Sequence, residues 1–272
     1  MELVPAHTRS FRELADLFER GFEDYFVPIR LNAETLAERM RFDGVDLSRS
    51  CIARINDEDA AIVLIAPRGW SSRVAAMGVM KAQRGKGLGR AVLRSLMDEA
   101  RELGERHMEL ECIATNERGL ALYAGEGFER RSRLVGFEAE APSAAAAALE
   151  AMDPAEFAAE MIRYGAEGLP FVFQAASLST LGAPCRGYRL EGACCVIADP
   201  SLATVRVHGV LVNPGSRRQG KASRLLQAVF AQHPGTQWNV AACVPEGLTP
   251  GLFEGLGFRP YPLTQWHMIA EL

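Results

Sequence analysis

The sequence predicts an α/β protein that contains two copies of one folding unit. Apolar runs typical of strands alternate with amphipathic helical stretches along the 272 residues, and this order is characteristic of sheets flanked by helices. The chain is also longer than one ordinary domain. Each half carries its own series of these elements, so we expect two domains of the same class.

The repeat is visible at single positions. Val79, Arg84, Gly87 and Gly89 recur 133 residues later as Val212, Arg217, Gly220 and Ala222. The pair Gly127-Phe128 recurs 130 residues later as Gly257-Phe258. A shared ancestry of the two halves, with small differences in loop length, explains both offsets.

In the first half, residues 9–21 place Leu14, Leu17 and Phe18 on one helical face, and Gly21 ends that helix. Asn32 suits the N-cap of a second helix. The whole expected order is helix 9–21, helix 33–42, strands 50–55, 60–66 and 73–80, helix 87–103, strand 107–114, helix 117–124 and strand 128–138.

The second half repeats much of this order after a change in composition at 138–154. The alanine-rich part of that stretch is typical of a linker or a small helix. We therefore predict a first domain over 1–140, a linker over 141–152 and a second domain over 153–272. The second domain is expected to hold helix 153–163, strands 188–198 and 204–212, helix 220–231, strand 238–244 and a short helix before Gly257.

Composition excludes several classes of function. The net charge is -4, which argues against nucleic acid as the main partner because phosphate binding needs a clustered basic surface. No apolar run approaches the roughly 20 residues that a membrane span needs, and the first residues show no secretion signal. We expect a cytoplasmic protein without a membrane partner.

The six cysteines form no CxxC pair and no regular framework. Several lie inside apolar runs, such as Cys112, Cys194 and Cys195. Free, mostly buried thiols in a reducing compartment are therefore expected, and no metal site is indicated.

A glycine-rich turn is the clearest chemical feature. Arg84-Gly85-Lys86-Gly87-Leu88-Gly89 follows a strand and opens a helix. Glycines allow the backbone to approach a ligand, and a helix N-terminus offers unpaired N–H groups to an anion. Because Arg84 and Lys86 add positive charge, the turn suits a pyrophosphate.

Two common nucleotide motifs do not fit this turn. The glycines at 85, 87 and 89 miss the spacing of a dinucleotide fold, and Lys86 is not followed by Ser or Thr as in a P-loop. In the second half, Gly215 and Gly220-Lys221 have P-loop spacing, but Ala222 cannot supply the hydroxyl that binds magnesium. We expect no ATP site in either half.

The turn together with Asn116, Leu122-Tyr123 and Gly127-Phe128 resembles the GNAT superfamily of N-acetyltransferases. The resemblance covers about residues 1–140 and implies two tandem GNAT-like domains, each a mixed central sheet flanked by helices. It also implies acetyl-CoA as co-substrate. By this resemblance Met77, Gly78 and Val79 offer backbone to the pantetheine arm, the turn from Arg84 to Gly89 holds the pyrophosphate, and Asn116 contacts the cofactor arm. Gly119 stands where the family usually has Ala, a departure that we expect to loosen the helix.

The same resemblance suggests catalytic residues. Tyr123 lies at the position of the tyrosine that protonates the leaving thiolate of CoA. Glu111 matches a position used as base in some family members that acetylate protein termini. Glu109 and Glu111 alternate along their strand and face the same side. Desolvation can raise the pKa of a glutamate toward neutrality and make it a base, although a chain of water molecules is an alternative.

The acceptor side of the cleft corresponds in this family to the loop between the first two helices. Here the loop contains Phe22, Tyr25 and Phe26 as candidate substrate-binding residues. Glu23 and Asp24 carry negative charge that would attract an amine. A small amine or a peptide N-terminus is the expected acceptor.

The second half keeps Arg217, Arg218, Gly220 and Ala222 as a possible anion site but lacks the proposed acid and base. Glu111, Asn116 and Tyr123 align with Ala241, Glu246 and Phe253. We therefore expect the chemistry in the first domain. Two alternatives remain open: a non-catalytic acyl-CoA binder or sensor, and a tandem enzyme whose second domain is the active one.

Overall fold

The computed structural model describes residues 1–272, which divide into two compact units. Unit 1 comprises Met1–Arg131 and Trp266–Leu272, and unit 2 comprises Ser132–Gln265. The expected boundary lies near residue 140, so two segments belong to the opposite unit from the one expected: 132–140 lie in unit 2 and 266–272 in unit 1. The alternating pattern of a strand shows that it pairs on a sheet but does not say which sheet edge it joins.

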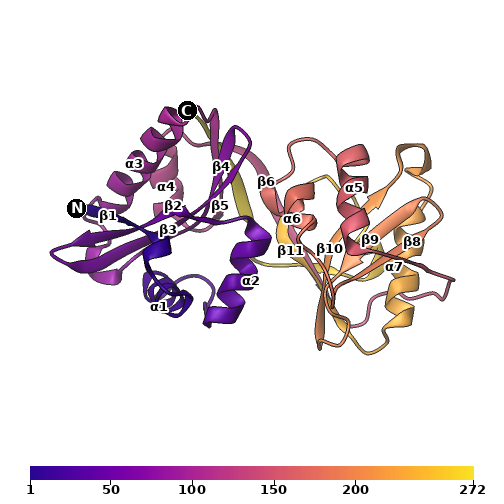
Figure 1. Ribbon diagram of the computed structural model, residues 1–272. Coiled ribbons are helices and arrows are strands. Elements are labelled where there is room, and N and C mark those ends of the chain that lie inside the picture. The colour runs from indigo at the N-terminus through magenta and orange to yellow at the C-terminus, as the bar shows by residue number, and fades with distance from the viewer. The chain divides into compact units, whose positions relative to one another are not determined.

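Unit 1 is a mixed sheet with helices on both faces (Figure 1). The strands follow one another across the sheet in the order β1 (Glu2–Pro5), β2 (Asp46–Ile55), β3 (Glu58–Arg68), β4 (Ser71–Val79), β5 (His107–Ile113) and β13 (Gln265–Glu271). The helices are α1 (Phe11–Gly21), α2 (Ala33–Asp43), α3 (Leu88–Glu102) and α4 (Glu117–Ala124). One core lies under α1 and α2, and another lies under α3 and α4.

The second helix begins at the predicted residue, Ala33, and the first begins at Phe11, two residues after the predicted start. Ser10 caps α1 by accepting a hydrogen bond from the Glu13 amide, and Glu13 binds back to the Ser10 amide at 2.8 Å. Asn32 caps α2 in the same way, since its Oδ1 accepts from the Thr35 amide at 2.8 Å. These reciprocal bonds satisfy amides that the first helical turn leaves unpaired.

Strands β4 and β5 are parallel and separate after a short pairing. They pair only over Ser71–Arg73 and His107–Glu109. Ala75 is an extra residue on β4 relative to β3, so the strand bulges there. Beyond Arg73 the edge of β4 that faces β5 is left without a strand partner.

Unit 2 has the same plan. Its strands follow in the order β6 (Glu129–Ala139), β11 (Gln237–Pro245), β10 (Thr204–Val212), β9 (Ala193–Ile197), β8 (Arg186–Leu190) and β7 (Glu150–Met152), and β12 (Arg259–Pro260) pairs with β6. The helices are α5 (Pro154–Tyr164), α6 (Ala175–Leu178) and α7 (Lys221–Gln232). Helix α7 packs on one core, and α5 and α6 pack on another.

The repeat extends to the details of the strands. Parallel strands β10 and β11 pair only over Thr204–Arg206 and Gln237–Asn239, and His208 forms a bulge that corresponds to Ala75. Gly127 and Gly257 both have positive φ angles, 88° and 86°. The two units thus share the separated central strands, the bulge and the final Gly-Phe turn.

Some predicted elements differ. The expected strand 188–198 is a hairpin, because Glu191 and Gly192 turn the chain with φ angles of 49° and 82°. The alanine run at 144–148 forms no helix. The short helix before Gly257 is a single 3₁₀ turn, Glu254–Leu256. Strands β1, β7, β12 and β13 were not foreseen from the sequence.

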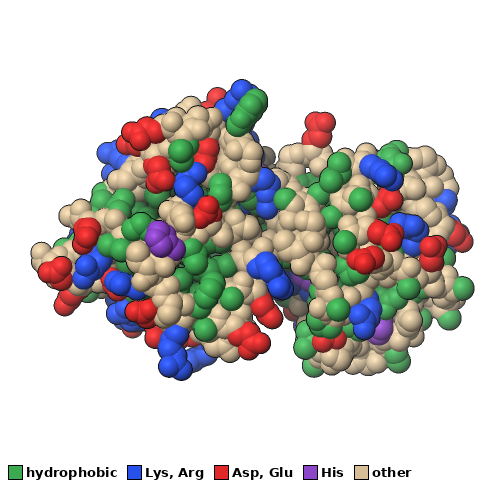
Figure 2. All heavy atoms as spheres, in the orientation of Figure 1, with side chains coloured by type: hydrophobic (Ala, Val, Ile, Leu, Met, Phe, Trp, Pro, Cys, Tyr) green, Lys and Arg blue, Asp and Glu red, His purple; other side chains and the backbone are tan.

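All six cysteines are free thiols, and four of them are buried. None of the helices is long and apolar enough to cross a membrane. On the face shown in Figure 2, acidic and basic side chains are interspersed over each unit, without a broad basic patch.

Candidate functional site

The glycine-rich turn of unit 1 is open to solvent at the N-terminus of α3. Gly87 is the residue before α3 and has a φ angle of +82°, and the first helical bond joins the Ala91 amide to the Gly87 carbonyl at 3.1 Å. The amides of the first turn of α3 are therefore unpaired and available to a ligand. No atom lies within 4 Å of the position that a Cβ would take at Gly85 or Gly87. The space over the turn fits a phosphate group.

Arg84 positions this turn instead of displaying its charge. Its Nε donates to the Val79 carbonyl at 2.9 Å, and its Nη2 donates to the carbonyls of Gly21 and Glu23 at 3.1 and 2.8 Å. Lys86 is exposed, and its Nζ makes one long contact of 3.4 Å with Gln83. Lys86 and the helix amides are thus the better placed groups for an anion, in contrast to the direct role expected for Arg84.

Met77, Gly78 and Val79 lie on the part of β4 that has separated from β5. Their other edge is paired with Val63, Ile62 and Ala61 of β3. Gly78 permits a close approach, because a Cβ there would lie 2.9 Å from the Phe22 ring and 3.1 Å from Gly21. The released edge offers backbone donors and acceptors to an extended ligand.

Two phenols, an amide and a thiol lie close together beside this edge, namely those of Tyr25, Tyr123, Asn116 and Cys112. Burial raises the pKa of Tyr123, and its neighbours Cys112 and Tyr25 add to the effect. Burial also raises the pKa of Tyr25, although a hydrogen bond with Asn116 opposes the shift. Both phenols therefore keep their protons at neutral pH and remain hydrogen-bond donors. Tyr123 and Asn116, far apart from Tyr25 in the sequence, are brought together with it.

Asn116 also caps α4, because its Oδ1 accepts from the Gly119 amide at 3.0 Å. A Cβ at residue 119 would lie 2.6 Å from Asn116 Nδ2 and 3.1 Å from Cys112 Sγ. Glycine at this position makes room for the Asn116 side chain. The sequence suggested only that glycine would loosen the helix, and it did not indicate this packing requirement.

The aromatic loop after α1 is only partly available to a substrate. Phe22 stacks on Phe18 with ring centroids 4.6 Å apart and packs against the core. Tyr25 meets the edges of Phe22 and Phe26 at 5.1 and 5.3 Å. Phe26 is 51% exposed. Of the three candidates, Tyr25 lies nearest the predicted catalytic residues and Phe26 is on the surface.

The carboxylates of this loop are paired with a lysine. Lys81 Nζ lies 2.8 Å from Asp24 and 3.6 Å from Glu23. The Lys81 ammonium lowers the pKa of Asp24. Since this cation offsets one of the two negative charges, the attraction of the loop for an amine is weaker than the sequence suggests.

Glu111 takes part in a buried ion pair. Its side chain is 5% exposed, and its Oε2 lies 2.7 Å from Nη2 and 2.8 Å from Nε of Arg73. Arg73 also contacts Asp43, at 3.3 Å. Glu111 is therefore engaged by a guanidinium and is not the free carboxylate beside a cleft that the sequence led us to expect.

Sequence reasoning did not identify the partners of the two strand glutamates. Arg73 begins an apolar strand, and a charge in such a place indicates a buried partner without identifying it. Glu109 binds His267 of β13, with 3.1 Å between Oε2 and Nε2. His267 follows Glu109 by 158 residues, and no local pattern connects positions so far apart.

The turn of unit 2 repeats the geometry of the first. Gly220 precedes α7 with a φ angle of +72°. Arg217 donates to the carbonyls of Val212 and Tyr164 at 3.1 and 2.8 Å, as Arg84 does in unit 1. Arg218 is exposed, and Ala222 lies in the first turn of α7. This anion site therefore has the same construction.

The chemistry of the two units differs. Phe253, at the position of Tyr123, is buried and stacks on Phe137 at 5.0 Å. Glu246 does not cap a helix as Asn116 does, because the short 3₁₀ turn that follows begins only at Glu254, after Phe253. Ala241 takes the position of Glu111. Unit 2 thus has neither the phenol of Tyr123 nor the carboxylate of Glu111 at the corresponding positions.

Comparisons with known proteins agree with this geometry. Residues 11–128 match the model of the acetyltransferase (GNAT) family. A tandem GNAT protein from the clavulanic acid biosynthesis pathway is 16% identical with a TM-score of 0.68, and the similarity covers 99% of this chain and 98% of that one. A GCN5-related N-acetyltransferase from Sphaerobacter thermophilus is 16% identical with a TM-score of 0.69, covering 98% and 93%. One from Anabaena variabilis is 14% identical with a TM-score of 0.65, covering 98% and 72%. These similarities establish the fold, and no curated protein matches the chain.

Proposed function

We propose that this chain transfers the acetyl group of acetyl-CoA to a primary amine in unit 1, and the match of residues 11–128 to the acetyltransferase (GNAT) family model supports the proposal. One arrangement carries the proposal. The released edge of β4 leads directly into the open turn before α3, and Tyr123, Tyr25 and Asn116 gather beside that edge. An elongated thioester with a pyrophosphate needs these features in this order.

The groups of unit 1 fit the parts of acetyl-CoA. The amides that begin α3, together with Lys86, would hold the pyrophosphate. Met77, Gly78 and Val79 would pair with the amides of the pantetheine arm. The absence of any atom over Gly85 and Gly87 leaves the room that phosphates require.

In the proposed reaction the amine nitrogen attacks the carbonyl carbon of the thioester. The C–N bond forms, the C–S bond breaks, and the sulfur leaves with the electron pair. Tyr123 donates its phenolic proton toward that sulfur as the C–S bond breaks, and its raised pKa means that the phenol is still protonated when the thioester binds. The proton returns to Tyr123 from solvent.

Removal of the amine proton is assigned to water. Glu111 is ion-paired with Arg73 and nearly inaccessible, which supports a positioning role more than that of the base that its sequence position suggested. Glu111 and Arg73 lie beside the paired ends of β4 and β5, where the two strands start to separate. Their ion pair would fix that separation.

The acceptor is a small amine or a peptide N-terminus, bound beside Tyr25 and Phe26. The aromatic edges of this loop and its one uncompensated carboxylate charge favour an acceptor with apolar as well as amine character. A cytoplasmic location, with access to CoA thioesters, is part of the proposal.

An activity screen over a panel of amines and short peptides, with free CoA as the readout, tests the function. Titration calorimetry with acetyl-CoA gives the binding step separately, and Gly87→Glu is the matched variant because its carboxylate would occupy the phosphate position. We expect binding in the wild type and none in the folded variant. Unchanged affinity in Gly87→Glu would remove the assignment of the turn, whereas binding without turnover of any amine would favour an acyl-CoA sensor.

A further inference from the structure

The α1–α2 loop of unit 1, residues 22–32, is bonded to the start of the glycine-rich turn. Arg84 Nη2 donates to the carbonyl of Gly21, the last residue of α1, at 3.1 Å and to that of Glu23, in the loop, at 2.8 Å. Lys81 lies in the short 3₁₀ turn between β4 and Arg84, and its Nζ lies 2.8 Å from Asp24 and 3.6 Å from Glu23. Two cations from one short segment thus contact the first residues of the loop.

The tip of this loop has little packing against the core. Phe22 and Ile29 pack against the core under α1 and α2, but most residues between them are exposed to solvent. Phe26 and Val27 are 51% and 44% exposed. Polar contacts and aromatic edges are therefore the main restraints on residues 23–28.

The loop begins with a tight turn that leads into Tyr25. The Tyr25 amide donates to the Phe22 carbonyl at 3.1 Å, so Glu23 and Asp24 are the two central residues of this turn. Asp24 has a φ angle of +58°, which is unfavourable for a residue with a side chain and needs support from its surroundings. The two cations contact both of these central residues. The position of the turn, and with it that of Tyr25, therefore depends on them.

Tyr25 in turn lies against the polar side chains beside β4. Its phenol forms a hydrogen bond with Asn116 and is a neighbour of Tyr123. Asn116 Oδ1 accepts from the Gly119 amide, so its Nδ2 is the group left to donate to the phenol. The first part of the loop is thus bonded to the start of the glycine-rich turn on one side and to the N-cap residue of α4 on the other.

The equivalent arginine of unit 2 makes only some of these contacts. Besides its bond to β10, Arg217 donates to the carbonyl of Tyr164, the last residue of α5, but it has no bond to the loop that follows. Pro214 stands at the position of Lys81 and carries no charge. The bonds that both units share therefore serve the turn, and the bonds found only in unit 1 serve the loop.

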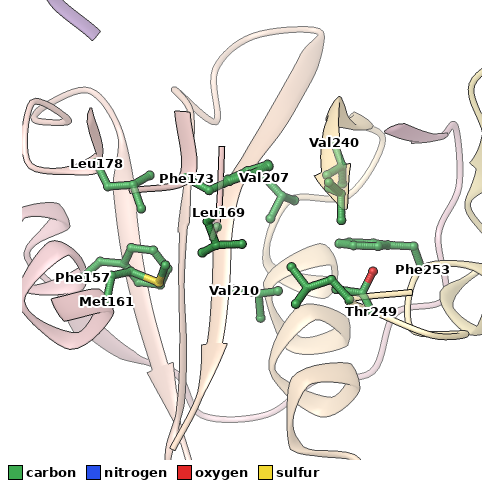
Figure 3. A pocket seen from close by; sticks show the side chains of 13 residues that line it. Phe157, Met161, Leu169, Phe173, Leu178, Val207, Val210, Val240, Thr249 and Phe253 are labelled. Carbon is green, nitrogen blue, oxygen red and sulfur yellow. The ribbon is translucent and has the colours of Figure 1, made fainter. Parts of the chain in front are cut away.

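Apolar packing takes the place of those bonds in unit 2. Leu169 and Phe173, from the segment after α5, lie beside the same space as Val207 of β10 (Figure 3). Leu169 and Phe171 are 9% and 2% exposed, in contrast to the exposed tip of the unit 1 loop. The polar contacts to the loop thus occur in the unit that also has the two phenols.

We propose that Lys81 and Arg84 are positioning residues for the amine acceptor, because they hold the loop so that the Tyr25 phenol stays beside Tyr123 and Asn116, where the acceptor binds. The inference rests on the acetyl transfer proposed for unit 1. Lys81 then acts on the acceptor, although it lies in the segment that leads into the proposed cofactor turn. Its removal should affect the amine and leave the affinity for acetyl-CoA intact.

Amide hydrogen exchange of the full chain, followed by mass spectrometry on peptides covering residues 22–28, tests the restraint without a substrate. Lys81→Met should raise the exchange rates there about threefold, because an exposed ion pair contributes little. Arg84→Lys should raise them on the order of tenfold or more, because a lysine cannot make the bonds of the guanidinium fork. Unchanged exchange in both variants, once circular dichroism shows that they fold, overturns the proposal.

Lys86→Met is the matched control, because Lys86 is also exposed near the turn but has no contact with the loop. It should leave the exchange of residues 22–28 unaltered and weaken acetyl-CoA binding in titration calorimetry, whereas Lys81→Met should do the reverse. Raising the salt concentration from about 0.05 to about 0.5 M should speed exchange in the wild type and have less effect in Lys81→Met, since salt screens the ion pair. Equal effects of the two lysine variants on the loop would contradict a specific role for Lys81.

Steady-state kinetics with phenethylamine as the amine connects the loop to the reaction. Lys81→Met should raise the KM for phenethylamine about threefold, with kcat and acetyl-CoA affinity within about twofold of the wild type. The exchanged pair, Asp24→Lys with Lys81→Asp, should restore both KM and the slow exchange. Restored exchange without restored KM would show that Asp24 binds the amine itself and would overturn the positioning role. A wild type that acetylates no amine counts against acetyl transfer, whereas the exchange rates still decide whether Lys81 and Arg84 hold the loop.

Discussion

The clefts of the two units share a backbone and differ in their side chains. In both, parallel central strands separate after three paired residues, a bulge follows, and an arginine joins a glycine-rich turn to the end of the first helix of the unit. Unit 1 surrounds its separated strands with phenols, an amide and an ion pair. Unit 2 surrounds the equivalent strands with valine, leucine and phenylalanine. The comparison indicates that the shared backbone is suited to an elongated anion, whereas a few side chains determine whether a unit can carry out acetyl transfer.

The largest expected difference concerns the two turns. Arg84→Ala combined with Gly87→Glu should lower the turnover of acetyl-CoA by more than about 10³-fold, because the phosphate site and the support of the turn are both lost. The corresponding pair in unit 2, Arg217→Ala with Gly220→Glu, should change turnover by no more than a few-fold. Steady-state kinetics measures both variants once circular dichroism shows that they fold. If the unit 2 variant is the inactive one, the roles of the units are reversed.

The next difference concerns the phenol. Tyr123→Phe should lower kcat by on the order of 10²-fold with little change in acetyl-CoA affinity, because the leaving sulfur loses its proton donor. Phe253→Tyr is the matched change in unit 2 and should leave kcat unaltered. Kinetics and calorimetry on each variant separate the two effects. Lost affinity with unaltered kcat would mark Tyr123 as a packing or binding residue.

Unit 2 has no buried ion pair that corresponds to Arg73 and Glu111 of unit 1. Arg206, at the position of Arg73, donates to Asn239 at 3.2 Å near the surface. Glu111→Gln should lower the free energy of unfolding by about 3 kcal/mol, because Arg73 loses a buried charged partner. Asn239→Ala should change it by less than about 0.5 kcal/mol. Urea titrations give both values.

The pH profile of Glu111→Gln decides whether Glu111 has a catalytic role as well. We expect the acidic limb of the kcat profile to persist in the variant, since water takes the amine proton. Loss of that limb with unchanged stability would identify Glu111 as the base after all.

The smallest expected difference comes from the two bulges. Burial, with help from Arg206, lowers the pKa of His208 to about 4, and Ala75 occupies the same place in unit 1. The folded protein then binds a proton at His208 less readily than the unfolded chain does. Unit 2 should therefore lose stability as pH falls from about 6.5 toward 4 and keep it above that window.

His208→Gln removes this titration. The loss of unfolding free energy between pH 7 and pH 5 should shrink by up to about 2 kcal/mol, with less than the full value expected because the side chain keeps some contact with solvent. Urea titrations of wild type and variant at the two pH values measure it. An equal loss in both proteins would show that His208 takes no part.

Local patterns in the sequence predicted most of the fold and the candidate turn. The cap at Asn32, the apolar strands and the glycines before α3 are each determined by neighbours in the chain, and the structure has them where expected. The α/β class was predicted in the same way, and the tandem arrangement of GNAT-like domains followed from the internal repeat together with the resemblance of the motifs to that family.

Features that depend on distant residues could not be predicted. The sequence around Glu111 does not indicate that this residue pairs with Arg73. The sequence around Arg84 likewise does not indicate that its guanidinium binds the carbonyls of Gly21 and Glu23. The hairpin turn at Glu191 was missed because a non-glycine residue with positive φ carries little sequence signal. The roles of Tyr123, Asn116 and Met77 in catalysis and binding remain predictions, which the variants above test.

The membership of β13 in unit 1 has a consequence for synthesis on the ribosome. His267, which binds Glu109, is translated only after the whole of unit 2 has been made. At ordinary elongation rates, the nascent first unit waits on the order of ten seconds with the β5 edge of its sheet unpaired. An exposed strand edge is a template for wrong pairing, so newly made chains should depend on chaperone protection more than two independent domains would.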